Sequence, residues 1–405
     1  MSIFTPIQPP PLSFPASDST VTVQAIDTTL RLYVRSENFL EPVIPGHEIY
    51  NCPTMAFLIT LPEAPTAPAR RILFDAGGRK DYWNYSPLVA GRFEKGVNVK
   101  GLRCDMGIHE VLEQGGVDLE GLESVIWSHW HFDHIGDMSK FPPAVDIVVG
   151  PGFKDNLLPG FPANPESALL ETDYNNHKVN EITFSPDFKI GDFEAFDYFS
   201  NGSFYLLNVP GHATGHMCAL ARTTESSFML LGADTCHFAG ALRPSPYNPL
   251  PETLDSATAG LDSYFPSPCP CSTFGGCHPA STVEEKRTIP YYRASQAPGS
   301  AYSDPDTANK SINSMKLFDA SPDVFVCLAH DPALFEVLPL FNQDNKNKIN
   351  DWKVMGYKES TKWRFLNELP RKGQRGREPT VFGFWRDGKR VDVGEAMRRE
   401  ERRLQ

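Results

Sequence analysis

Short apolar segments, rich in β-branched residues and separated by turn residues, recur along most of the chain. Runs of this kind are typical of β-strands when Gly, Pro, Asn or Asp bound them. They predict strands at Thr28–Arg35, Met55–Leu61, Arg71–Phe74, Leu122–Trp127, Val145–Val149, Asp192–Phe199, Phe204–Val209, Met217–Arg222, Phe228–Leu231 and Asp323–Leu328. Two further segments predict helices, Met106–Gln114, which ends at a glycine pair, and Thr307–Phe318.

Other parts of the chain lack this pattern. Residues 1–27 form a Pro-rich arm, which we expect to be extended or disordered. Residues 151–190 and 238–304 are rich in Pro, Gly, Asn or Ser and predict long loops, which often wall or cover active sites. Residues 346–405 form a polar, basic extension, in which 380–386 reads as a strand or packing segment and 395–403 as a short helix.

The charge is unevenly distributed over the 405 residues. The net charge is −12, but residues 351–405 carry +6 and the rest of the chain carries −18. Nucleic-acid binding requires a basic surface, so we expect a small-molecule substrate and no nucleic-acid partner.

The chain shows no sign of a membrane or secreted location. No run of 18 apolar residues occurs, so no membrane-spanning helix is expected. The first residues lack the basic start and apolar stretch of a secretory signal. The eight cysteines have no regular spacing, which favours a reduced, cytoplasmic protein.

One group of cysteines has two interpretations. Cys269, Cys271, Cys277 and His278 lie within ten residues and could form a small structural zinc site. Their spacing fits no common zinc pattern, so a loop with incidental cysteines is favoured.

The strongest chemical signal follows the predicted strand at 122–127. His129, His131, Asp133 and His134 lie within six positions, although the chain has only 11 histidines. Imidazole and carboxylate groups are good ligands for divalent metals. Residues two apart in a strand point to the same side, so His129 and His131 could face one ion while Asp133 and His134 face another.

The motif His-x-His-x-Asp-His resembles the signature of the metallo-β-lactamase superfamily. The resemblance covers residues 28–345 with insertions, of which about 238–304 is the longest. It implies an α+β fold, the four-layer αββα sandwich, with a metal site at one edge of its two sheets. It also implies a catalytic domain at 28–345, between the N-terminal arm (1–27) and the C-terminal extension (346–405).

The resemblance extends to further positions at predicted strand ends. Asp75 matches a residue that orients a ligand histidine from outside the metal shell. His212, in a Pro-Gly-His sequence, His330, and the bridging carboxylate Asp234 match further ligands, whereas His216 is expected to be a structural neighbour. The implied set is His129, His131 and His212 for the first ion, Asp133, His134 and His330 for the second, and Asp234 between them.

This ligand set implies a hydrolase. Two zinc ions fit the donors best, although iron, manganese or cobalt also bind such groups. A water shared by two such ions has its pKa lowered from 15.7 toward about 7, which makes it a nucleophile at neutral pH. Asp133 or a bound water would then protonate the leaving group.

The motifs indicate the type of reaction more closely than they indicate the substrate. The motif order resembles lactonases and lactamase-like enzymes, and the long insertion resembles a fungal branch that opens lactams and lactones in detoxification or secondary metabolism. In lactonases a Tyr three residues after the bridging Asp assists the substrate carbonyl, but here that position is His237, which could donate a hydrogen bond or carry a proton.

Other functions are compatible with the same fold. A thioesterase of the glyoxalase II or polyketide-releasing kind, or a phosphodiesterase, would use the same metals. A non-catalytic metal-binding scaffold would be expected to lack ligands, and none is missing here.

Overall fold

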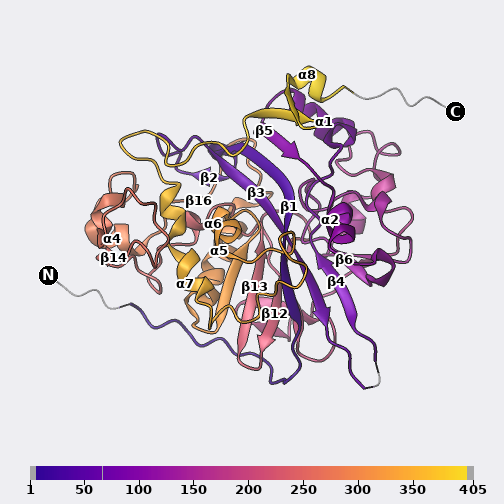
Figure 1. Ribbon diagram of the computed structural model, residues 1–405, viewed down its shortest axis with the longest axis horizontal. Coiled ribbons are helices and arrows are strands. Elements are labelled where there is room, and N and C mark those ends of the chain that lie inside the picture. Colours follow the sequence, from indigo (N-terminus) through magenta and orange to yellow (C-terminus); the bar gives the residue numbers. More distant parts are fainter. Residues whose placement is uncertain (1–5, 66, 399–405) are drawn as a thin grey trace.

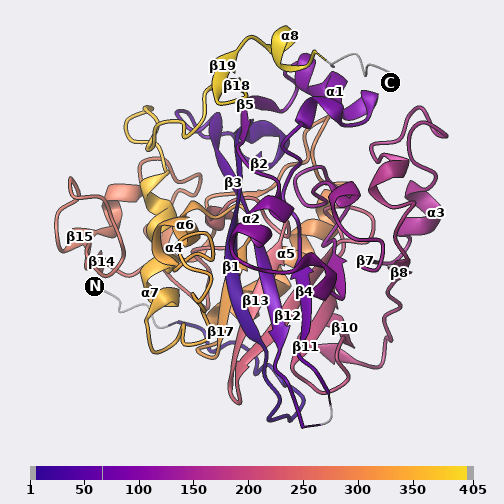
Figure 2. The same cartoon turned by 45° about the vertical axis from the view of Figure 1, so that its right-hand side comes forward.

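Two β-sheets packed face to face form the centre of the computed structural model, which describes residues 6–65 and 67–398 (Figures 1 and 2). The larger sheet has nine strands in the order β19-β18-β5-β1-β3-β4-β6-β7-β8. Their bounds are β1 Thr22–Arg35, β3 Ile49–Leu61, β4 Arg70–Phe74, β5 Val99–Cys104, β6 Ser124–Ile126, β7 Asp146–Val149, β8 Val179–Glu181, β18 Gly383–Arg386 and β19 Lys389–Val391.

The second sheet has six strands in the order β17-β13-β12-β11-β10-β9. Their bounds are β9 Lys189–Ile190, β10 Phe193–Asp197, β11 Phe204–Asn208, β12 Met217–Thr224, β13 Ser227–Ala233 and β17 Val324–Leu328. Two small pairs complete the strands: β2 Leu40–Glu41 with β16 Arg293–Ala294, and β14 Thr253–Leu254 with β15 Cys269–Pro270.

Helices surround the two sheets (Figures 1 and 2). They are α1 Pro87–Glu94, α2 Ile108–Gln114, α3 Phe153–Leu157, α4 Val283–Thr288, α5 Pro305–Ala320, α6 Pro332–Val337, α7 Tyr357–Lys362 and α8 Val393–Ala396. Helix α2 shares a core cluster with the outer face of the nine-stranded sheet, and α5 shares one with the six-stranded sheet. The predicted four-layer αββα sandwich is therefore confirmed.

Strand β13 shows why the strands read as continuous apolar runs. Successive side chains point to opposite faces of a sheet. Met229 and Leu231 therefore face the core between the sheets, while Phe228 and Leu230 pack with the α5 side. Because both faces are buried, polar residues are excluded from both.

The ten strands and two helices predicted from the pattern are all present, but several boundaries differ, and the strand expected from Met55 begins at Ile49. The strand expected from Thr28 begins at Thr22, so residues 22–27 of the predicted arm belong to β1. The helix expected at 395–403 is the short α8, which ends at Ala396, and residues 399–403 lie outside the described residues.

The basic C-terminal residues pack closely against the sandwich. Strand β18, in the segment 380–386, pairs with β5 in parallel and extends the large sheet. Ile349 and Trp352 are buried in the core between the sheets. The division into arm, catalytic domain and extension stays a prediction, although β1 crosses its first boundary and one core cluster contains residues from both sides of the second.

Residues far apart in sequence pair at the start of β1. Backbone N–H groups of Phe341 and Ile349 donate to the carbonyls of Ala25 and Val23. The side chain of Asn350 accepts from the N–H of Val23, 327 positions away, and donates to Val21.

Among the residues with described structure, no helix has the length and apolar character that a membrane crossing requires.

Candidate metal centre

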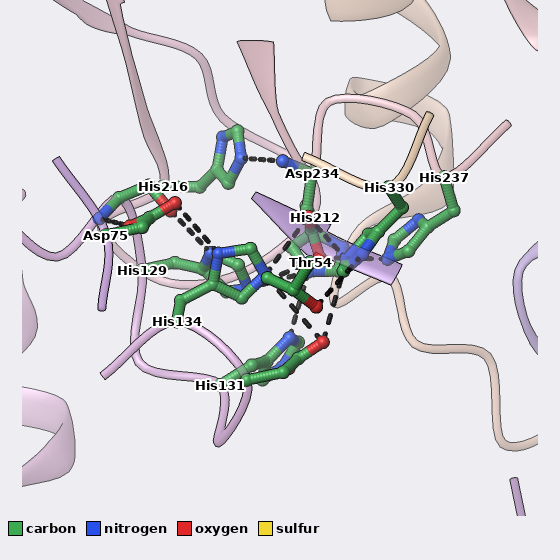
Figure 3. A network of polar contacts seen from close by, with 12 residues as sticks. Thr54, Asp75, His129, His131, His134, His212, His216, Asp234, His237 and His330 are labelled. Atoms are coloured by element: carbon green, nitrogen blue, oxygen red, sulfur yellow. Dashed lines mark hydrogen bonds and ion pairs between the residues drawn. The ribbon is translucent and has the colours of Figure 1, made fainter. Parts of the chain in front are cut away.

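The candidate ligands follow the ends of strands from both sheets. The loop that holds the His-x-His-x-Asp-His motif follows β6, and Asp75 follows the parallel neighbour β4. His212 follows β11, Asp234 follows β13 and His330 follows β17, which is parallel to β13. These strand ends meet at one edge of the sandwich, so the labelled histidines converge on Asp234 (Figure 3).

The first group contains the three histidines predicted for one ion. Nε2 of His212 lies 3.1 Å from Nε2 of His129 and 2.9 Å from Nδ1 of His131. Oδ2 of Asp234 lies 3.6 Å from Nε2 of His129 and 3.4 Å from Nε2 of His212. Three imidazoles and one carboxylate oxygen thus surround one position.

The second group lies on the other side of the same carboxylate. Oδ1 of Asp234 is 3.2 Å from Nε2 of His134 and 3.0 Å from Nε2 of His330. Oδ2 of Asp133 is 3.8 Å and 3.6 Å from the same two nitrogens. Asp234 therefore presents one oxygen to each group, which is the arrangement a bridging ligand requires.

Unsatisfied polar atoms show that this arrangement fits a pair of metal ions. Nε2 of His134, Nε2 of His330 and Oδ1 of Asp234 are buried, and the two nitrogens lie 3.0–3.2 Å from the oxygen, but none of the three makes a hydrogen bond of suitable geometry within residues 6–65 and 67–398. Leaving such atoms unpaired is costly, whereas a divalent cation would satisfy all three. The cluster of histidine and aspartate donors forms a dinuclear metal site.

The pKa values of the histidines shift in opposite directions in the two groups. Burial lowers the pKa of His129 and His212 well below the usual range and that of His131 to about 3, so these rings are neutral and ready to bind a metal. Burial also opposes charge on His134 and His330, but nearby carboxylates, Asp234 foremost, raise their pKa. The second group is thus a site of strong negative potential.

Further contacts reach the rings of His134 and His330 from outside the cluster. Oδ2 of Asp75 lies 2.8 Å from Nδ1 of His134, and Oδ1 accepts from the N–H of Ser128 at 2.8 Å. Nδ1 of His330 donates to the Pro53 carbonyl at 2.9 Å. The predicted contact between Asp75 and a candidate ligand is therefore present, although its orienting function stays a prediction.

His216 lies beside the cluster without pointing a free nitrogen into it. Its Nδ1 donates to the Val209 carbonyl at 2.8 Å, and its Nε2 accepts from the N–H of Asp234 at 3.2 Å. Because both nitrogens are engaged with backbone, His216 supports the loop that carries Asp234.

Asp75→Asn is expected to weaken metal binding by about 10–100-fold, the usual cost of losing an outer partner of a ligand histidine. The amide nitrogen of Asn would face Nδ1 of His134 and favour the tautomer that carries its proton on Nε2. Titration against a competing chelator measures the affinity, with Asp118→Asn, at an exposed helix cap, as the control. An affinity equal to wild type would contradict the orienting role.

His237 and Tyr302 form a second layer beside Asp234. Nε2 of His237 lies 3.0 Å from Oδ2 of Asp234, and its Nδ1 lies 2.9 Å from the hydroxyl of Tyr302. Burial lowers the pKa of His237. The catalytic role of His237 stays a prediction, but both of its nitrogens have partners inside the protein. No sequence pattern marked Tyr302, because it lies in the loop-rich insertion.

A cavity of about 370 Å³ opens onto the cluster. Its wall includes apolar side chains from β1, α1 and β5, together with His131, Asp133, Asp234, His237 and His330. The insertion contributes residues 299–303, whereas α4 and β14 lie at the flank of the molecule (Figure 1). From the loops at 151–190 only Ala168 reaches the wall among the described residues.

The cysteine group of the insertion does not form a metal site. Nε2 of His278 bonds to the Ile289 carbonyl, and its Nδ1 accepts from the N–H of Ala280. All eight cysteines are free thiols. The alternative of a structural zinc site is therefore not supported, and the interpretation as a loop with incidental cysteines agrees with the geometry.

Known proteins resemble this chain over most of its length. The model of the metallo-beta-lactamase superfamily matches residues 50–221. Gamma-lactamase FDB1 of Fusarium pseudograminearum is 40% identical, and the match covers 89% of this chain and 85% of that protein. Metallo-hydrolase mfmC of Annulohypoxylon moriforme is 37% identical, with 90% and 92% covered.

Solved structures agree on the fold. The structure of B. thuringiensis AiiA with N-decanoyl-L-homoserine at its active site has a TM-score of 0.52 and 17% identity, covering 80% of this chain and 98% of that one. Together, the ligand geometry, the sandwich and the matches over most of its length show that the chain belongs to the metallo-beta-lactamase superfamily.

Proposed function

We propose that this protein is a dinuclear, zinc-dependent hydrolase that opens a small cyclic amide or ester. The observation that carries the proposal is Asp234, whose two oxygens face two separate groups of ligands at the floor of a cavity. Imidazole and carboxylate donors suit zinc, although iron or manganese also fits them.

The cavity supports a small substrate. A volume of about 370 Å³ is at the lower end of ligand pockets. Apolar side chains such as Leu32, Val34 and Phe93 form much of its wall, which favours a compact, uncharged ring over an extended polymer. The name of the FDB1 relative, a gamma-lactamase, supports a cyclic amide.

The chain's own residues would have distinct tasks in this reaction. The two ions, when bound, would activate a water and polarise the substrate carbonyl. The apolar wall would hold the ring against the cluster and exclude bulk water. Asp133, which lines the cavity, would take a proton from the water that attacks the carbonyl carbon and pass it to the ring nitrogen or oxygen as the ring bond breaks.

The purified protein is expected to contain about two ions per chain. Removing them with a chelator should abolish hydrolysis and lower the melting temperature, because ions that bind only the folded state stabilise it by about 4 kcal/mol at 1,000 times their Kd. Elemental analysis identifies the metal, and adding back zinc, iron or manganese separately shows which ion restores activity. One ion or fewer in fully folded protein would contradict the dinuclear site.

A substrate panel tests the chemistry directly. Metal-loaded protein should hydrolyse a γ-lactam or γ-lactone faster than a thioester or a phosphodiester. A preference for glutathione thioesters, acyl-carrier thioesters or phosphodiesters would replace the proposal with the corresponding alternative. A cytoplasmic location and a part in xenobiotic or secondary-metabolite metabolism stay predictions.

A further inference from the structure

Tyr302 lines the cavity, and its hydroxyl group lies on the ring of His237, which lines the same cavity. Its segment is held by backbone bonds from Ser303 to the His212 carbonyl at 2.8 Å and from Asp304 to the Gly211 carbonyl at 2.9 Å. Ala301 donates to the Asn38 carbonyl at 2.8 Å. The Tyr302 ring is 4% exposed and lies across the ring of His212, with centroids 5.2 Å apart. The hydroxyl is therefore held beside the metal ligands.

The hydrogen-bonding capacity of His237 is already used. A carboxylate can only accept, so the 3.0 Å contact with Asp234 places the ring proton of neutral His237 on Nε2. Nδ1 is then an acceptor, and the partner 2.9 Å away, the Tyr302 hydroxyl, must donate to it. His237 has no proton left for a substrate.

Tyr302, in contrast, keeps capacity for a second bond. A hydroxyl group has one proton and two acceptor lone pairs. With its proton directed to His237, its oxygen can only accept from a molecule in the cavity, which Tyr302 lines. An N–H group is therefore the complementary partner at this point of the wall.

We propose that Tyr302, positioned by His237, accepts the N–H of a cyclic amide and makes the site selective for secondary lactams over lactones of the same shape. The ring oxygen of a lactone offers only lone pairs, so it would meet the lone pairs of Tyr302 without a bond. The inference rests on the proposed function and narrows its substrate class to lactams with a free N–H.

The opposite polarity would follow if Nε2 of His237 bound a metal ion together with Asp234 and His330, whose ligand atoms lie within 4.8 Å of it. Nδ1 would then carry the proton and donate to Tyr302. The hydroxyl proton would be free to donate into the cavity, and lactones would gain from Tyr302 as much as lactams. The two arrangements therefore predict opposite changes in selectivity.

The test compares kcat/KM for a γ-lactam and the γ-lactone of the same skeleton in wild type and Tyr302→Phe. The ratio of the two kcat/KM values is compared between the two proteins. The greater intrinsic reactivity of the lactone affects both ratios equally and therefore cancels. We expect the lactam value to fall about tenfold, the scale of one hydrogen bond, and the lactone value to stay the same or rise. The N-methyl lactam, which lacks the N–H, should be hydrolysed equally by both proteins.

Tyr292→Phe is the matched control, because the Tyr292 hydroxyl also lies on a buried histidine, 2.6 Å from Nδ1 of His47. Tyr292 belongs to the same insertion but is not part of the cavity wall. This variant should keep the wild-type ratio, and all three proteins should contain the same amount of metal.

Each other outcome overturns the inference in a recognisable way. A ratio unchanged by Tyr302→Phe, with lactam still hydrolysed, would remove the role of Tyr302 and leave the proposed function intact. If kcat/KM for the lactone falls together with kcat/KM for the lactam, the Tyr302 hydroxyl donates a hydrogen bond into the cavity instead of accepting one. Wild-type protein that hydrolyses neither ring would overturn the proposed function together with the inference.

Discussion

Asp234→Ala is expected to bind fewer than two ions per chain and to lose most of its turnover. The side chain presents Oδ1 to His134 and His330 and Oδ2 to His129 and His212. Removing it takes one ligand from each ion at once. The loss should exceed the roughly 10–100-fold that the loss of an outer partner typically costs.

Metal analysis and lactam turnover on the same sample measure this effect. Asp323→Asn, which removes a half-exposed ion pair with Lys353, is the control and should match wild type in both. Two ions per chain with turnover near wild type in Asp234→Ala would show that Asp234 does not bridge the ions, and turnover near wild type with only one ion would contradict the dinuclear mechanism.

Asp319→Ala is expected to lower the free energy of unfolding by about 3–5 kcal/mol, the cost of breaking a buried ion pair. Asp319 is 1% exposed and contacts Arg243, which is 3% exposed, at 2.5–3.0 Å. Its carboxylate also accepts from Asn248, and its backbone carbonyl accepts from Lys358. The substitution leaves the guanidinium of Arg243 buried without its counter-ion, where the insertion meets α5 and α7.

Acid should remove part of the same stability. Burial opposes the charge of Asp319, but Arg243 lowers its pKa to about 2, below the ordinary 3.8. The unfolded chain therefore takes up this proton at higher pH than the folded protein does. The contribution of about 2 kcal/mol is complete above pH 4 and is lost as the pH falls toward 2.

Urea unfolding of metal-free protein between pH 6 and pH 3 measures both effects without interference from metal release. Asp319→Asn should show a weaker dependence on pH than wild type in the acid range. Asp323→Ala, at the exposed pair, should cost no more than about 1 kcal/mol. Equal losses in Asp319→Ala and Asp323→Ala would contradict a structural role for the buried pair.

The sequence was most informative where local pattern and chemistry coincide. The strands that precede Asp234 and His330 are buried on both faces, so their apolar runs are unbroken and their ends are easily located. The motif at 129–134 supplies four candidate ligands within one turn. Position in a strand, residue type and the resemblance to the superfamily together predicted the residues that the fold brings into one cluster.

Features that depend on distant contacts could not be predicted in this way. The pattern at 380–386 predicts either a strand or a packing segment, and only the pairing of the four-residue β18 with the distant β5 decides between them. Tyr302 reaches the cavity because backbone bonds hold its loop against His212, which no periodicity encodes. The role of His237 depends on two contacts, one with Asp234, three positions away, and one with Tyr302, 65 positions away. Only the contact with Tyr302 lies beyond the local sequence.

The pairing of β1 with residues 341–350 has a consequence for how the protein is made. About 325 residues separate the first half of β1 from the segment that covers it. At 5–20 residues per second, a ribosome needs roughly 15–65 s to deliver that segment. During this time an apolar strand edge stays open, and open edges pair readily with other chains. The edge at the start of β1 is therefore available to other chains until synthesis is nearly complete.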